Sequence, residues 1–311
     1  MGATGTESAS VAARRVRAVA RRLSAVAAML ALAGGACVLP GNVTRAQREM
    51  AAGDLEGARE ILERERDEHP RSADVRVALG EVYYRIARDA LDREHDEARY
   101  LDYLERSVGE FVTAVELDPR DDRPHFFLAV MDTYRGDVRE ALRGFALVKR
   151  LRPSGVAYTN IAETYVYLGK VDTAQEWNDL GLRKGAPYGA VLFNDMLIAW
   201  RAGDLPQARR SFANLRDGHP DMLRTINAAP LPETPRRFED FAGYCCRSPA
   251  CGPYLEDACR ELSLEVQQRE LSEEAVRREL VIEMEKQRRL RNVYEQHKEL
   301  EIEIEREPAE R

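Results

Sequence analysis

The residues of this chain best suited to chemistry are four clustered cysteines: Cys245, Cys246, Cys251 and Cys259. In an exported protein, an even number of clustered cysteines predicts disulfide bonds that staple a small loop. Three pairings are open to four cysteines, and the strain of joining neighbours disfavours a Cys245–Cys246 bond. Zinc is the alternative, but adjacent cysteines lack the two-residue gap that lets a cysteine pair chelate one ion. The cluster therefore indicates two disulfides, with a zinc site as the competing interpretation.

Signatures of catalysis or cofactor binding do not accompany these cysteines in the sequence. The chain contains five histidines, but it has no HExxH pair, GxSxG turn or phosphate-binding glycine loop. The densest acidic cluster lies between Asp89 and Asp96, where no loop pattern organises ligands for a cation. Carboxylates elsewhere are typical of solvated helix faces. We therefore expect no catalytic residue, no metal and no cofactor, and a protein that is not an enzyme.

The N-terminus has the organisation of a targeting segment. Basic residues at 14–22 precede an apolar run at 23–33, which is followed by two glycines, Ala36 and Cys37. This order predicts a secretory signal peptide over residues 1–36, and the run is too short to span a membrane, which needs about 20 residues. The small residues before Cys37 resemble the lipobox of bacterial lipoproteins, which implies a lipid on Cys37. Simple cleavage after Ala36 is the alternative.

The elements that would position a binding surface lie between Asp122 and Pro220, where one pattern occurs three times at a spacing of 33 or 34 residues. Each copy has a glycine that ends one helix, an alanine that lets a second helix pack closely, and a closing proline. The three sets are Gly136, Ala141 and Pro153; Gly169, Ala174 and Pro187; and Gly203, Ala208 and Pro220. The period predicts consecutive helical hairpins.

A helix-turn-helix unit of about 34 residues with these markers resembles the tetratricopeptide repeat. Upstream, Gly53 and Ala58 mark a further copy, and Gly80 lies in the first helix of the next one. That copy is too long for a standard repeat, and we interpret residues 88–100 as an insertion that lengthens both of its helices. The resemblance implies an all-α superhelix of about five hairpins over residues 37–222.

The same resemblance implies a partner groove, lined by the first helix of each hairpin. By register, the groove positions are mostly apolar or aromatic: Val77, Tyr84, Phe126, Val130, Tyr134, Tyr167, Phe193, Leu197 and Trp200. The Lys/Asn/Arg clamp with which some family members hold a carboxylate is absent at these positions. An apolar groove suits an amphipathic helix or an extended apolar segment of a protein partner. Packing between repeats is the alternative role for each residue taken singly.

The composition changes after the hairpins. Prolines from Pro230 to Pro235 break the helix periodicity, so we expect residues 223–260 to form a linker and the cysteine-rich loop. Residues 261–311 are rich in charged residues and favour one long helix. Its apolar stripe consists of Val276, Leu280, Met284, Leu290, Val293 and Tyr294. Three interpretations stay open: the helix forms a coiled coil that self-associates, it is solvated, or it folds back and places the stripe in the groove.

The net charge of −7 argues against nucleic acid as a partner, because neutralising phosphates requires a concentrated basic surface. The expected protein is a non-enzymatic interaction scaffold of the bacterial cell envelope, on its periplasmic side. It would be tethered to a membrane, with the outer membrane favoured, if Cys37 carries a lipid. The layout is similar to that of envelope lipoproteins with such repeats, although architecture does not fix function. The alternatives are a structural spacer that oligomerises through the C-terminal helix, and an accessory subunit of an envelope enzyme.

Overall fold

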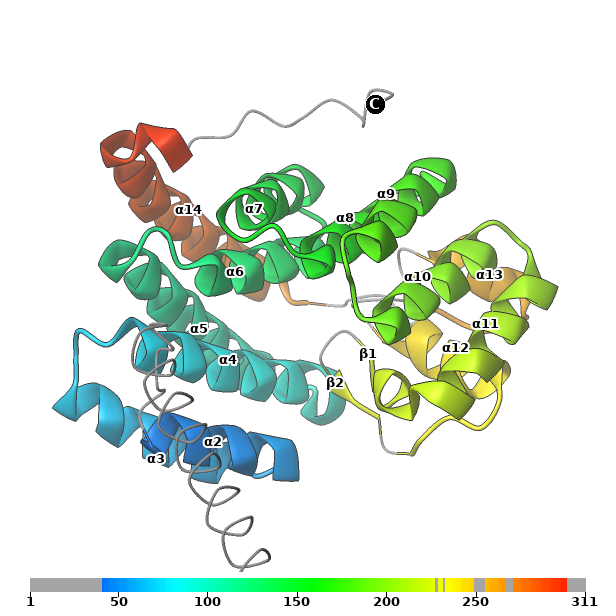
Figure 1. Ribbon diagram of the computed structural model, residues 1–311. Helices are drawn as coiled ribbons and strands as arrows, with labels where there is room; N and C mark the ends of the chain where they lie inside the picture. The colour runs from blue at the N-terminus through cyan, green and yellow to red at the C-terminus, as the bar shows by residue number, and fades with distance from the viewer. Residues whose placement is uncertain (1–40, 227–228, 232, 249–254, 267–270, 301–311) are drawn as a thin grey trace, which may run out of the picture. The chain divides into compact units, whose positions relative to one another are not determined.

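A computed structural model describes residues 41–226, 229–231, 233–248, 255–266 and 271–300 (Figure 1). The chain divides into two units, Met1–Gly41 and Asn42–Arg311. The expected signal peptide and Cys37 lie outside the described residues. Within the described part of the chain, no helix is both long and apolar enough to cross a bilayer.

The second unit is built from helices, as predicted, and ten of them form five consecutive hairpins. The pairs are α2 (Gly41–Ala52) with α3 (Leu55–Glu68), α4 (Ala73–Asp89) with α5 (Glu97–Leu117), α6 (Asp122–Arg135) with α7 (Val138–Leu151), α8 (Gly155–Tyr167) with α9 (Val171–Arg183), and α10 (Tyr188–Arg201) with α11 (Leu205–Gly218). Each hairpin from the second onward packs against the one before it. The all-α, tetratricopeptide-like stack of about five hairpins is therefore confirmed.

Local sequence accounts for where these helices end and how closely they pack. The turn glycine Gly136 closes α6 with a φ of 82°, and Gly203 after α10 has a φ of 78°. Backbone of this left-handed kind is strained for residues with a Cβ. At the start of α11, the Asp204 carboxylate accepts a hydrogen bond from the backbone N–H of Gln207 at 3.0 Å, which caps the helix. The pattern alanines Ala141 and Ala208 are fully buried.

The second hairpin is the long one, as the insertion at 88–100 predicts. The first helix, α4, continues into a π-helical turn, η1 (Ala90–Glu94), and the second, α5, has 21 residues. Asp96 caps α5 through a hydrogen bond from the backbone N–H of Arg99 at 2.9 Å. The added length is apolar on its inner side, where Ala90, Leu91, Tyr100, Leu101 and Leu104 are buried. The insertion thus adds core rather than a loop.

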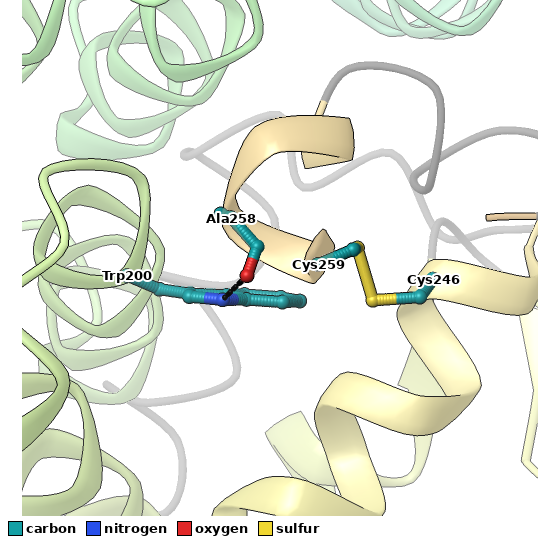
Figure 2. Close-up of a disulfide and its surroundings, with 4 residues drawn as sticks. All are labelled: Trp200, Cys246, Ala258 and Cys259. Atoms are coloured by element: carbon teal, nitrogen blue, oxygen red, sulfur yellow. Dashed lines mark hydrogen bonds between the residues drawn. A yellow bond between two sulfur atoms is a disulfide. The ribbon is translucent and has the colours of Figure 1, made fainter. Parts of the chain in front are cut away.

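A small cap follows the last hairpin. Its elements are η2 (Pro220–Leu223), the two-residue antiparallel strands β1 (Thr225–Ile226) and β2 (Ala229–Pro230), α12 (Phe238–Arg247) and α13 (Glu256–Glu261). A disulfide bond between Cys246 and Cys259 joins α12 to α13, with Cα atoms 5.9 Å apart (Figure 2). The ring of Phe238 packs edge-on against Trp200 of α10 at 5.5 Å. The cysteine-rich segment therefore closes the end of the hairpin stack.

The long C-terminal helix, α14 (Glu273–Gln296), is followed by a short turn, η4 (Lys298–Leu300). It folds back along α5 and α6 rather than standing free. Its inner face carries Ala275, Glu279, Ile282, Lys286, Leu290 and Val293, all buried. The predicted stripe is wrong for three positions, because Val276, Leu280 and Met284 are exposed. The inner face instead includes two charged side chains, Glu279 and Lys286, which the apolar pattern of the sequence does not place there.

Candidate functional site

The residues predicted to line an open groove are packed in the interior. Trp200 and Leu197 are essentially fully buried, and Val77, Tyr84 and Tyr167 keep 6% or less of their surface exposed. The remaining four are partly buried against the hydrophobic core: Phe126, Val130, Tyr134 and Phe193. None of the nine is an exposed anchor for a partner. The five buried positions therefore have a packing role, whereas the groove role of the four partly buried ones stays a prediction.

Neighbouring elements of the same chain cover several of these side chains. The cap covers α10: the indole Nε1–H of Trp200 donates to the carbonyl oxygen of Ala258 at 3.1 Å (Figure 2). Further along the stack, Tyr84 and Tyr134 lie parallel with ring centroids 6.3 Å apart, and the guanidinium of Arg88 lies over Tyr134. On α8, the Tyr167 hydroxyl donates to Glu163 at 2.8 Å.

The C-terminal helix does fold back onto the hairpins, but it does not use the predicted groove. It contacts His125, Asp132 and Arg135 of α6, which lie seven and three residues apart on one face of the helix. The predicted positions Phe126, Val130 and Tyr134 lie on the neighbouring face. The prediction that the C-terminal helix folds back onto the hairpins is therefore correct, but the helix packs on a different face of α6 from the predicted one.

A cleft of about 830 Å³ remains between α6, α7 and the C-terminal part of α14. Its floor is apolar and its rim carries charges of both signs. The lining residues are His125, Leu128, Ala129, Asp132, Glu140, Arg143, Gly144, Leu147, Gln287, Leu290, Arg291, Tyr294, Glu295, Lys298 and Leu300. This volume is within the range of sites that take a small molecule or several side chains of a peptide.

Two aromatic residues close one end of the cleft. The Nε2 of His125 lies 3.0 Å from the carbonyl oxygen of Pro119, which can only accept, so Nε2 carries the proton. Nδ1 is then free to accept from the Tyr294 hydroxyl at 3.4 Å. Burial lowers the pKa of His125, so the imidazole is neutral at pH 7. Burial, with the nearby charge of Asp132, raises the pKa of Tyr294 above its ordinary value. Both groups are therefore neutral polar contacts rather than charged ones.

The rim of the cleft is more basic than acidic. Arg143 lies 3.7 Å from Glu140, and this pair stays on the α7 side. Across the cleft, Arg291 and Lys298 are exposed and make no ion pair with the residues that the structure describes. Together with Glu295 the rim holds three cations and two carboxylates. An acidic group on a ligand would find two cations available.

A buried ionic network fixes the wall of the cleft that α14 supplies. Lys286, which is 2% exposed, contacts the Asp132 carboxylate and lies 2.8 Å from Glu283. Arg135 of α6 contacts Glu283 and also pairs with Asp137 at 2.7 Å. Burial raises the pKa of Asp132 to about 7. Burial also acts to raise the pKa of Glu283, but Lys286 and Arg135 outweigh it and lower that pKa.

Little in the amino-acid sequence indicates this buried ionic network. Glu283 and Lys286 stand three residues apart in α14, which is the ordinary spacing of a solvated pair on a charged helix. Their partners on α6 lie about 150 residues away along the chain. Only long-range packing identifies these charges as buried.

Carboxylates that could hold a metal occur in two groups within the described residues. In the first, Asp132, Asp137 and Glu283 already face Lys286 and Arg135, so cationic side chains neutralise them. The second consists of Glu65, Glu68 and His69, and two of its three members are exposed. Neither arrangement favours a metal over the ion pairs and solvent that surround it.

The cysteines are disulfide-bonded where the structure describes them. Cys246 pairs with Cys259, and Cys245 is disulfide-bonded as well. Cys251 lies outside the described residues. The predicted disulfide bonding of the cluster is thus present at Cys246 and Cys259, the pairing that the sequence left open, and the thiolates of the bonded cysteines are not available to zinc.

In comparisons with known proteins, no family model matches this chain and no curated protein sequence matches it. The features of this chain that bear on its function are the hairpin stack, the cleft and the exposed surface of α14. Of these features, the cleft combines an apolar floor with two rim cations, Arg291 and Lys298, that make no ion pair with the described residues.

Proposed function

We propose that this protein is a non-enzymatic adaptor that binds a segment of a protein partner in the cleft between α6, α7 and α14. The observation that carries the proposal is the combination of an apolar floor, formed by Leu128, Leu147 and Leu290, with a charged rim. Stacked helical hairpins present such surfaces on a rigid scaffold. The resemblance to tetratricopeptide repeats supports the same class of function.

The chemistry of the cleft favours one kind of ligand. Aliphatic or aromatic side chains of a helix or extended segment of the partner would pack against the apolar floor of the cleft and lose contact with water. Arg291 and Lys298 would then pair with acidic residues that flank those anchors in the partner. An amphipathic segment with acidic neighbours is therefore the proposed ligand. Buried apolar anchors supply most of the affinity in such interfaces, and rim charges supply orientation.

Photo-crosslinking tests this proposal. A photoreactive phenylalanine analogue replaces Arg143 at the rim, and in a control replaces Glu176, which is exposed on α9. In cells of the native host, the rim position is expected to give a discrete adduct of higher mass. The double variant Arg291→Glu/Lys298→Glu should reduce its yield. The proposal would be overturned by the absence of an adduct at the rim, or by the same adduct at the control position.

The cellular location is a separate part of the proposal and is supported by sequence alone. The basic and apolar order of residues 14–33, followed by Cys37, favours export and attachment to an envelope membrane. Intact mass of the protein from the membrane fraction tests it. A mature chain that begins at Cys37 and carries acyl mass is expected, whereas a full-length unmodified chain would exclude the lipid anchor.

A further inference from the structure

The outer face of α14 carries an apolar ridge. Val276, Leu280, Val281 and Met284 expose 53%, 57%, 63% and 64% of their surface. Eight large hydrophobic residues are exposed in the part of the chain that the structure describes, and these four lie within nine positions of one helix. Single exposed hydrophobics are ordinary, but a cluster of this kind marks an interaction surface.

The described hairpins of the protein do not cover this apolar ridge. Val276, Leu280 and Met284 follow one another at intervals of four, so they share one side of the helix. The opposite side holds Ile282 and Lys286, which are buried against α5 and α6. Because the buried ionic network fixes the rotation of α14, the ridge stays turned outward. The described hairpins therefore leave the ridge open to another molecule.

The charges that flank the ridge identify that molecule. Glu273 precedes Leu280 by seven residues, and Arg288 follows Val281 by seven. If a second α14 lies antiparallel, with the two-fold axis passing between Leu280 and Val281, then Glu273 of each copy comes opposite Arg288 of the other. A parallel pair in register would instead set Arg277 against Arg277 and Arg288 against Arg288, which is repulsive. Within one copy Glu273 pairs with Arg277, and Arg288 pairs with Glu285. Of the two arrangements, the antiparallel one sets opposite charges rather than like charges at both ends of the ridge.

We propose that this protein forms a homodimer through the ridge of α14, packed antiparallel against the same ridge of a second copy. Identical patches that meet about a two-fold axis are the usual form of such an interface. The apolar centre consists of Leu280 and Val281 of both copies, and Val276 and Met284 extend it on each side. Because only four apolar side chains per copy take part, the dimer is weak and depends on protein concentration. The proposal is independent of the cleft and its ligand.

Sedimentation velocity of the full chain over a concentration series tests the dimer. The mass is expected to rise from monomer to dimer with concentration. The variants Leu280→Glu and Val281→Glu should each shift the midpoint at least tenfold upward, because they place a carboxylate in the apolar centre. Leu182→Glu, at another exposed leucine on α9, should leave the midpoint unchanged. A chain that is monomeric throughout, or a dimer indifferent to Leu280→Glu, would overturn the proposal.

A charge exchange tests the orientation. Glu273→Arg and Arg288→Glu should each weaken the dimer several-fold, because like charges then face each other across the two-fold axis. The double variant Glu273→Arg/Arg288→Glu restores opposite charges and should return the midpoint to within about twofold of the wild-type value. If the double variant is weaker than both single variants, the antiparallel pairing is wrong. Circular dichroism confirms that each variant is folded.

Discussion

The ammonium group of Lys286 and the carboxylate of Asp132 meet in the interior between α14 and α6. Lys286 keeps 2% of its side chain exposed and Asp132 keeps 7%. The pair joins residues 154 positions apart and holds the C-terminal helix to the hairpins. Removing one partner would leave the other buried without its counter-ion.

Replacing Lys286 with methionine should therefore destabilise the protein. At pH 8, where Asp132 with its pKa of about 7 is ionised, we expect the free energy of unfolding to fall by about 3 kcal/mol, since breaking a buried pair from one side strands a charge. Urea unfolding followed by circular dichroism measures the loss. Lys298→Met is the matched control, because that lysine is exposed, and it should change stability by less than about 0.5 kcal/mol. Equal small effects of both substitutions would show that the network does not hold α14.

Stability should also depend on pH through Asp132. Its pKa is raised by burial from 3.8 to about 7, so the folded state binds this proton more tightly than the unfolded state. The stabilising contribution is fully present below pH 4 and is lost as pH rises toward 7. A shift of this size corresponds to about 4 kcal/mol at most.

The variant Asp132→Asn isolates this effect. The free energy of unfolding of the wild type minus that of the variant should fall between pH 4 and pH 7. Burial also lowers the pKa of His125, but this histidine is present in both proteins, so its contribution cancels in the difference. A difference that stays flat with pH would mean that Asp132 is ionised throughout.

Gly80 and Gly109 form a matched pair in the long hairpin. A Cβ added at Gly80 would lie 2.8 Å from Cε1 of Phe111, which is fully buried, whereas nothing lies within 4 Å of one added at Gly109. Gly80→Ala should lower the free energy of unfolding by about 1 to 3 kcal/mol through overpacking. Gly109→Ala should raise it by about 0.5 to 1 kcal/mol, because alanine favours the helix. Thermal denaturation of both variants measures the two changes in the free energy of unfolding. Changes of the same sign would contradict the close packing of α4 on α5.

The disulfide between Cys246 and Cys259 should stabilise the cap. The bond closes a loop over a sequence separation of 13, for which chain entropy gives about 3 kcal/mol. Cys246→Ala/Cys259→Ala should lower stability by roughly that amount and red-shift the fluorescence of Trp200, whose indole lies against α13 (Figure 2). Unchanged fluorescence and stability would show that α13 stays in place without the bond.

The hairpins could be predicted from sequence because their signals are local. Gly136, Ala141 and Pro153 act through backbone conformation and close packing within one repeat, so one copy carries all the information. The insertion at 88–100 could be predicted for the same reason, because the next residues of the repeat pattern come later in the sequence than the period requires. The clustered cysteines indicated a disulfide, and Cys246 and Cys259 form one.

The surfaces were decided by tertiary structure. Tyr84, Trp200 and the other predicted groove residues are apolar whether they bind a partner or fill the core. Only the folded chain shows that five of them are buried and four partly buried. In α14, Leu280 faces water and Lys286 is buried. A lysine can be buried only where a carboxylate from elsewhere offsets its desolvation. That carboxylate belongs to Asp132, and its position relative to Lys286 exists only once the chain has folded.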